Sequence, residues 1–183
     1  DPKKIKDTDK KLLKKKWNIE ESKKIILLPG RLTEWKGQEI FIEAINILKK
    51  SLPDLDFVAI ILGSDQGRKI YKKKLLRLVE QYRLNKQLRF VDECKNMPAA
   101  YKIANLIVSA SIEPEAFGRV SVEAQSMEKP IIASNIGGSN ETIIDNKTGI
   151  LFESGKAESL SKKIIEVLQL DDSTLKSMGN EGR

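Results

Sequence analysis

Two glutamates with a fixed spacing lie in the middle of the chain: Glu115 and Glu123, with seven residues between them. Both belong to the segment Ser109–Glu123, which reads SASIEPEAFGRVSVE. The apolar run Asn105–Val108 before it is typical of a strand, and the pattern Arg119–Met127 is typical of a helix. We therefore expect an acidic, glycine-containing loop at a strand-to-helix junction, where open α/β sheets bind nucleotides. Taken alone, the spacing fits a solvated face with one salt bridge equally well.

The expected helix determines the surroundings of the second glutamate. Its inward stripe is formed by residues at i, i+4 and i+7, namely Val120, Ala124 and Met127. Glu123 lies beside this stripe, so its carboxylate loses water and needs hydrogen-bond donors from the protein or from ligand hydroxyls. The amides of the first helical turn are expected to be unpaired donors that favour a phosphate or a sugar hydroxyl: Phe117, Gly118 and Arg119.

A second loop with chemical potential follows the first expected strand. The loop Gly30–Gly37 contains Arg31, which offers a planar fork to phosphate oxygens, and Lys36, which offers a mobile point charge. Its glycines allow the backbone to approach a ligand closely. Considered by itself, the loop also fits an ordinary basic turn.

Two further glycine-containing loops follow strands. They are Gly63–Gly67 and the pair Gly137 and Gly138, which is followed by Glu141 in a short helix. Each signal is weak alone. Because the carboxyl ends of parallel strands meet at one edge of a sheet, all four loops are expected to converge there.

The fold class follows from the alternation of the two patterns. We expect a doubly wound, mostly parallel α/β sheet with helices on both faces. The expected strands are Lys23–Pro29, Phe57–Leu62, Leu88–Val91, Asn105–Val108, Pro130–Ser134 and Gly149–Phe152. The expected helices are Gln38–Lys50, Tyr71–Tyr82, Ala99–Ile103, Arg119–Met127, Glu141–Ile144 with Ser139 as its N-cap, and Ala157–Leu168, the last of the chain.

Composition excludes several classes of chemistry. The 183 residues contain no histidine, which excludes histidine-based acid–base catalysis, and one cysteine, Cys94, which excludes an internal disulfide. The net charge of +7 favours anionic partners, but aromatic residues make up only 5%, so we expect a lysine-rich surface and no nucleic-acid partner. No segment reads as a membrane span or a leader, and a cytoplasmic setting is expected.

Together these residues resemble the retaining glycosyltransferases of family 4, the group 1 type, and specifically the C-terminal, donor-binding half of a GT-B enzyme. The resemblance covers nearly the whole chain. It is carried by four motifs in order: GRLTEWKG at Gly30–Gly37, the segment Glu115–Glu123, PIIASNIGGSNE at Pro130–Glu141, and NKTGIL at Asn146–Leu151.

The resemblance implies a role for each matching residue. Arg31 and Lys36 would bind the donor diphosphate and neutralise the charge that grows on the leaving nucleotide, so neither a metal nor another cofactor is expected. Glu115 would contact the donor sugar as the third catalytic residue, Glu123 would bind the ribose hydroxyls, and Val91 would lie near the base. The other residues expected to bind the donor are Gly30, Gly37, Phe117, Gly118, Arg119, Gly137, Gly138 and Glu141.

The resemblance also implies partners. Residues 1–183 are expected to form one nucleotide-sugar-binding domain, with an acceptor glycan or glycolipid bound by an N-terminal domain that this chain lacks. Peripheral contact with the inner face of the membrane stays open, as does a product such as lipopolysaccharide or another surface glycan. The fragment alone is expected to transfer little or nothing. The alternatives are a non-catalytic anion-binding module and a relative of sugar-nucleotide epimerases or of sucrose or glycogen synthases.

Overall fold

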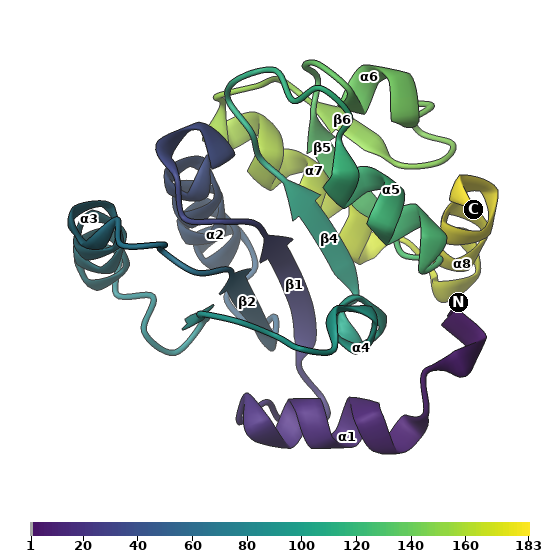
Figure 1. Ribbon diagram of the computed structural model, residues 1–183, viewed down its shortest axis with the longest axis horizontal. Coiled ribbons are helices and arrows are strands. Elements are labelled where there is room, and N and C mark those ends of the chain that lie inside the picture. The colour runs from purple at the N-terminus through teal and green to yellow at the C-terminus, as the bar shows by residue number, and fades with distance from the viewer. Residues whose placement is uncertain (1) are drawn as a thin grey trace.

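The computed structural model describes residues 2–183, in which six strands form one parallel sheet covered by helices (Figure 1). The expected fold class is confirmed. The strands are β1 (Lys24–Pro29), β2 (Phe57–Leu62), β3 (Leu88–Val91), β4 (Leu106–Ser109), β5 (Ile131–Ser134) and β6 (Ile150–Phe152). The helices are η1 (Pro2–Lys4), α1 (Asp7–Lys16), η2 (Glu34–Lys36), α2 (Gln38–Ser51), α3 (Lys69–Gln81), α4 (Met97–Ile103), α5 (Arg119–Ser126), α6 (Ser139–Thr142), α7 (Ala157–Gln169) and α8 (Asp172–Gly182).

The order of the strands creates a crevice. Across the sheet they run β3-β2-β1-β4-β5-β6, and each neighbouring pair is parallel. The first half of the chain adds strands to one side of β1, and the second half adds them to the other side. The winding therefore reverses between β1 and β4, so the loops after these two strands diverge and leave a crevice at their carboxyl ends.

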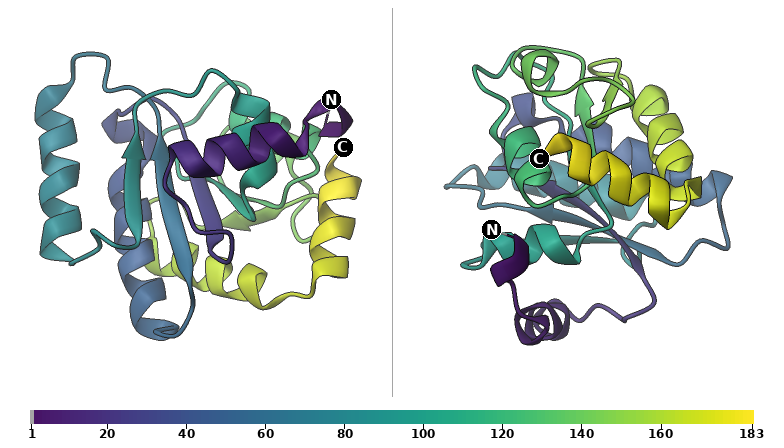
Figure 2. Two further views of the ribbon diagram at one scale, coloured as in Figure 1. Left: turned by 90° about the horizontal axis from the view of Figure 1, so that it is seen from below. Right: turned by 90° about the vertical axis from the view of Figure 1, so that its right-hand side faces the viewer.

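Two apolar cores hold the sheet between its helices. Alternate side chains of β1 point to opposite faces: Ile26 and Leu28 pack with α2, α3 and α7, whereas Ile25 and Leu27 pack with α1, α4 and α5. All of β2 is buried, as expected for a parallel strand covered on both faces. Figure 2 shows α1 and α7 on opposite sides of the sheet. No helix within residues 2–183 is long and apolar enough to cross a bilayer.

Most of the expected elements are present with ends that differ by one or two residues, but two expectations near the C-terminus are wrong. The helix expected at Glu141–Ile144 is present as α6 with both ends two residues earlier, but its N-cap is Gly138, and Ser139, the expected N-cap, is its first residue. The chain also continues beyond α7 into α8, whose Met178 is buried in the core. The α8 sequence is mostly polar, so this helix is stabilised by packing on the rest of the chain, through Met178 in the core and through contact with α5.

Candidate functional site

The carboxyl ends of β1 and β4 border a cleft of about 420 Å³. It lies at the reversal of the winding, where the topology leaves a crevice. Six of the expected site residues line it: Gly30, Arg31, Lys36, Glu115, Arg119 and Glu123. The structure thus brings the cations of the first loop and the two glutamates of the second loop to one place, although they are about eighty or more residues apart in sequence.

An ion pair joins the two loops across the cleft. The ammonium of Lys36 lies 2.7 Å from Oε1 of Glu115, and the two side chains are only 13% and 15% exposed. The same ammonium lies 4.4 Å from the centre of the Trp35 ring, which favours its positive charge. The hydroxyl of Ser111 donates a hydrogen bond to Glu115. Sequence reasoning had expected both charged residues at the site but not their direct pairing.

Close backbone packing fixes the first loop against β4. Gly37 has a left-handed backbone with φ of +68°, and a Cβ there would lie 1.8 Å from the carbonyl oxygen of Ala110. Only glycine fits such an approach. The amide of Ile112 also donates to the carbonyl of Trp35 at 2.8 Å. Gly37 does not line the cleft; it lets the two loops that do so come together.

Two linked hydrogen bonds of buried side chains support the backbone of Arg31. Gln38 is fully buried, and its amide nitrogen donates to the carbonyl oxygen of Arg31 at 2.8 Å. Its amide oxygen accepts the hydroxyl of Tyr71 at 3.1 Å. Burial, with a smaller effect of nearby glutamates, raises the pKa of Tyr71, so it stays a neutral donor. The sequence analysis did not predict these hydrogen bonds. The signal was Gln38 itself, which lies three and four residues before the apolar Phe41 and Ile42 and therefore on the buried face of α2.

The second glutamate obtains its donors from the protein. The hydroxyl of Tyr101 in α4 lies 2.7 Å from Oε2 of Glu123, and Arg119, one turn earlier in α5, lies 3.2 Å from Oε1. Burial first, and this hydrogen bond second, raise the pKa of Tyr101, so its proton stays available to the carboxylate. The expectation that Glu123 needs donors is confirmed, and Tyr101 is a site residue that sequence reasoning missed.

The glycine pair after β5 packs against the acidic loop. The amide of Gly138 donates to the carbonyl of Glu115 at 2.8 Å. Gly137 has φ of +56°, and a Cβ there would lie 2.7 Å from the amide nitrogen of Glu115. The amides of Phe117 and Gly118 donate to no carbonyl among residues 2–183, as expected for the start of a helix. Gly137 and Gly138 therefore fix the backbone of the loop that carries Glu115.

Seven of the expected donor-binding residues do not line the cleft: five belong to loops around it, namely Gly37, Phe117, Gly118, Gly137 and Gly138, and the other two, Val91 and Glu141, lie on β3 and α6. Val91 ends β3, which β2 separates from β1, and its carbonyl accepts the amide of Gly63 at 2.8 Å. Glu141 is exposed on α6 and does not line the cleft. The loop Gly63–Gly67 borders a different hollow. Convergence at one edge of the sheet is nevertheless confirmed for all four loops, because the loop after β2 lies against the loop after β1, where the amide of Leu32 donates to the carbonyl of Ser64 at 3.1 Å.

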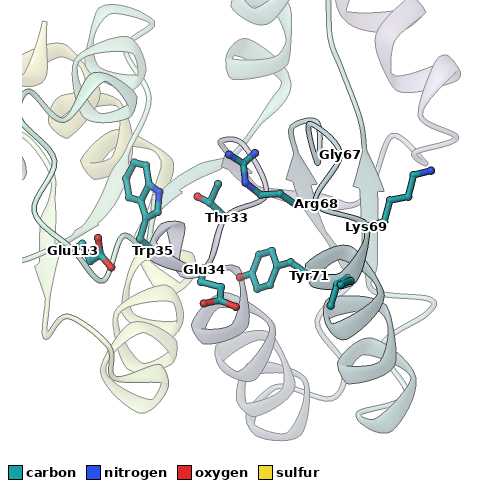
Figure 3. A pocket seen from close by; sticks show the side chains of 9 residues that line it. Thr33, Glu34, Trp35, Gly67, Arg68, Lys69, Tyr71 and Glu113 are labelled. Carbon is teal, nitrogen blue, oxygen red and sulfur yellow. The ribbon is translucent and has the colours of Figure 1, made fainter.

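That neighbouring hollow, of about 640 Å³, shares Trp35 with the cleft. Figure 3 shows Trp35 and Glu113 together at one end of it, with Arg68 in the middle and Lys69 directed away. Tyr71 extends from α3 toward the loop that carries Glu34. The indole of Trp35 therefore forms a partition between the two spaces.

The sequence profile of the family described as "Glycosyl transferases group 1" matches residues 9–183. The chain belongs to this family. Among curated relatives, a D-inositol 3-phosphate glycosyltransferase of Paenarthrobacter aurescens is 34% identical over 156 residues, covering 84% of this chain and 37% of that protein. The chain therefore spans little more than a third of the length of that relative.

Solved structures of glycosyltransferases share the fold. A glycosyltransferase from Rickettsia africae superposes with a TM-score of 0.94 and 32% identity, over 100% of this chain and 47% of that one. Anabaena Alr3699/HepE, solved in complex with UDP-glucose, gives a TM-score of 0.87 and 25% identity, over 97% of this chain and 47% of that one. The neighbours are GT-B enzymes, and the chain covers the C-terminal domain of these homologues. The resemblance read from the four motifs is confirmed.

Proposed function

We propose that the chain is the donor-binding half of an enzyme that transfers a sugar from a nucleotide-diphosphate sugar to an acceptor, with retention of configuration. The observation that carries this proposal is the meeting of a cationic loop and two glutamates in one cleft at the reversal of the winding. The UDP-glucose complex of Anabaena Alr3699/HepE, which has the same fold, supports a nucleotide sugar as the ligand.

The cationic loop binds the diphosphate. Lys36 has three ammonium hydrogens, of which Glu115 takes one, so others can reach phosphate oxygens. Arg31 is exposed at the cleft and forms no ion pair within the described part of the chain. As the bond from sugar to diphosphate breaks, negative charge grows on the leaving nucleotide, and these two cations stabilise it in place of a metal ion.

The two glutamates orient the donor. Glu115 accepts hydroxyls of the sugar and holds Lys36 at the diphosphate; it has no role as nucleophile. Glu123 binds the ribose: each of its oxygens accepts one protein donor, from Tyr101 or Arg119, and retains a lone pair for a ribose hydroxyl. The amides of Phe117 and Gly118 add donors for sugar or phosphate oxygens.

The acceptor and its location complete the proposal. An acceptor glycan or glycolipid binds to a further domain, and the enzyme acts in the cytoplasm, at the inner face of a membrane when the acceptor is a lipid. A surface glycan such as lipopolysaccharide stays a prediction. Residues 1–183 alone bind the donor and transfer little.

Calorimetric titration of the 183-residue chain with UDP, GDP and ADP tests the site. Replacing Arg31 by alanine should weaken binding of the best of the three about 10- to 100-fold, the usual loss for a charge-assisted hydrogen bond. The matched control is Arg77→Ala, on the exposed side of α3, which should bind as the unmodified chain does.

A deoxy nucleotide separates the ribose contact from the phosphate contact. The unmodified chain should bind the 2′-deoxy nucleoside diphosphate more weakly than the ribo form, whereas Glu123→Ala should bind the two alike. If Arg31→Ala and Glu123→Ala both leave nucleoside-diphosphate affinity unchanged, the site assignment is wrong.

A further inference from the structure

A second cleft lies at the opposite edge of the sheet from the donor site. It is bordered by α1, by the end of α4 and by the turn before β5, and it measures about 350 Å³. Asn105, which lines it, accepts the amide of Ile25 near the start of β1. Figure 1 shows α1 and α4 beside the tails of the strand arrows, away from the arrowheads. A ligand bound here is therefore separate from one bound at the carboxyl ends of β1 and β4.

The lining of this cleft is strongly basic. Five lysines from three segments border it: Lys10, Lys11, Lys14, Lys102 and Lys129. Its two acidic residues are already engaged, Asp7 with Lys10 at 2.6 Å and Glu21 with Lys14 at 2.6 Å. Lys102 is held by Glu128 at 3.4 Å, outside the lining, so Lys11 and Lys129 are the two lining lysines without an acidic partner in the described residues, and their charges attract an anion.

Lys129 is the residue that local structure does not explain. Lysines at the end of a helix can complement the helix dipole, which accounts for Lys102 in the last turn of α4. Lys129 is half-buried, and within residues 2–183 its ammonium makes no ion pair or hydrogen bond. Burial first, and the charges of Lys102 and Lys10 next, lower its pKa to about 8. A charge that is desolvated and repelled in a cleft is a functional-site candidate.

We propose that this lysine cleft binds a phosphate group, as a second anion site independent of the donor site. Lys129 is half-buried in the turn before β5 and Lys11 is exposed on α1, so a phosphate would have donors from two segments. Ammonium groups bind phosphate as point charges and do not need the planar geometry that a guanidinium supplies. The phosphate can belong to a free metabolite or to the headgroup of an anionic lipid, and the chemistry at the lysines is the same.

The test follows backbone amides by NMR while sodium phosphate is added to the 183-residue chain at pH 6.5 and constant ionic strength. Amides of 10–14 and 102–105 should shift in a saturable manner, and those of the loops after β1 and β4 report the donor site separately. Lys129→Gln should weaken the first response about fivefold or more, as expected for loss of one charge-assisted contact. The matched control is Lys50→Gln, an exposed lysine on α2.

Lys11→Gln keeps the test valid if Lys129→Gln alters stability or folding, because Lys11 is exposed and makes no ion pair in the described part of the chain. It should also weaken the response. The proposal is overturned if phosphate causes no saturable shift at 10–14 and 102–105, or if both lysine variants respond as the unmodified chain does.

Vesicle sedimentation distinguishes the two sources. Retention by phosphatidylglycerol vesicles but not phosphatidylcholine vesicles, reduced by Lys129→Gln, identifies a lipid headgroup as the ligand. The exposed Leu12 on α1 would then provide an apolar contact. A saturable, Lys129-dependent response to phosphate without vesicle binding identifies a free phosphate compound.

Discussion

The ion pair between Lys36 and Glu115 should contribute measurably to stability as well as to the site. Pairs exposed to water contribute at most about 1 kcal/mol, whereas breaking a buried pair costs about 3–5 kcal/mol. At 13% and 15% exposure this pair lies between those limits. We expect a coupling free energy of about 1–3 kcal/mol, further supported by the Trp35 ring beneath the ammonium and the Ser111 hydroxyl on the carboxylate.

A double-mutant cycle measures that coupling. Lys36→Met keeps the aliphatic stem, and Glu115→Gln keeps an acceptor for Ser111. Each single variant leaves one charge without its partner, so each should lower the free energy of unfolding by about 2 kcal/mol, and the double variant should lose less than the sum. Urea unfolding at pH 7 provides the free energies by linear extrapolation.

An exposed pair in the same chain is the matched control. Lys74 and Glu39 lie 2.7 Å apart but are 58% and 29% exposed. Their cycle should give a coupling of about 0.5 kcal/mol or less that disappears in 0.5 M salt, an order-of-magnitude expectation for exposed charges. The coupling of Lys36 with Glu115 should persist in that salt. Additivity of Lys36→Met and Glu115→Gln within about 0.5 kcal/mol would refute the reasoning.

Two further predictions concern a glycine and a lysine. Gly37→Ala should lower the free energy of unfolding by about 3 kcal/mol or more, because its Cβ would overlap the carbonyl of Ala110. Gly67 also has a positive φ, of +84°, but a Cβ there would meet open space, so Gly67→Ala should lower the free energy of unfolding by only about 1–2 kcal/mol. If urea unfolding gave equal losses for Gly37→Ala and Gly67→Ala, the argument from the Ala110 carbonyl would be contradicted. Lys129 has its pKa lowered from 10.5 to about 8 by folding, so its cost to stability is full below pH 8 and fades as the pH rises to 10.5. Lys129→Met should raise the free energy of unfolding at pH 7 by about 1–3 kcal/mol and should abolish the increase of this free energy between pH 8 and 10.5. Lys50→Met should change neither quantity. If Lys129→Met left the pH profile of stability unchanged, the lowered pKa of Lys129 would be contradicted.

The parts of the site that local pattern predicts are those fixed by strand ends and helix period. The Gly30–Gly37 loop and the loop with Glu115 follow buried apolar runs, and parallel strands bring such loops to one edge. The place of Glu123 beside an apolar stripe follows from the spacing of its neighbours in α5. These features depend on residues close in sequence, so they could be predicted without coordinates.

The parts that local pattern does not predict depend on long-range contacts. Tyr101 reaches Glu123 from α4, and Tyr71 reaches Gln38 from α3; neither approach can be read from the period of a helix. Val91 lies away from the cleft because β2 separates β3 from β1, and strand order is not contained in the pattern of one strand. The polar helix α8 forms through packing of residues such as Met178 on the rest of the chain.

The donor cleft has one wall from each half of the chain, and this division has an evolutionary consequence. A recombination crossover in the connection between β3 and α4 would exchange the glutamate wall as a unit and leave the cationic wall intact. The exchanged half would have to match along the β1–β4 pairing and where α2 packs on α7, and the two walls would have to match at the Lys36–Glu115 pair, at the close approach of Gly37 to Ala110, and at the bond from Ile112 to Trp35. Under the proposed function, such an exchange would vary the residues proposed to contact the sugar and retain the cations proposed to bind the diphosphate.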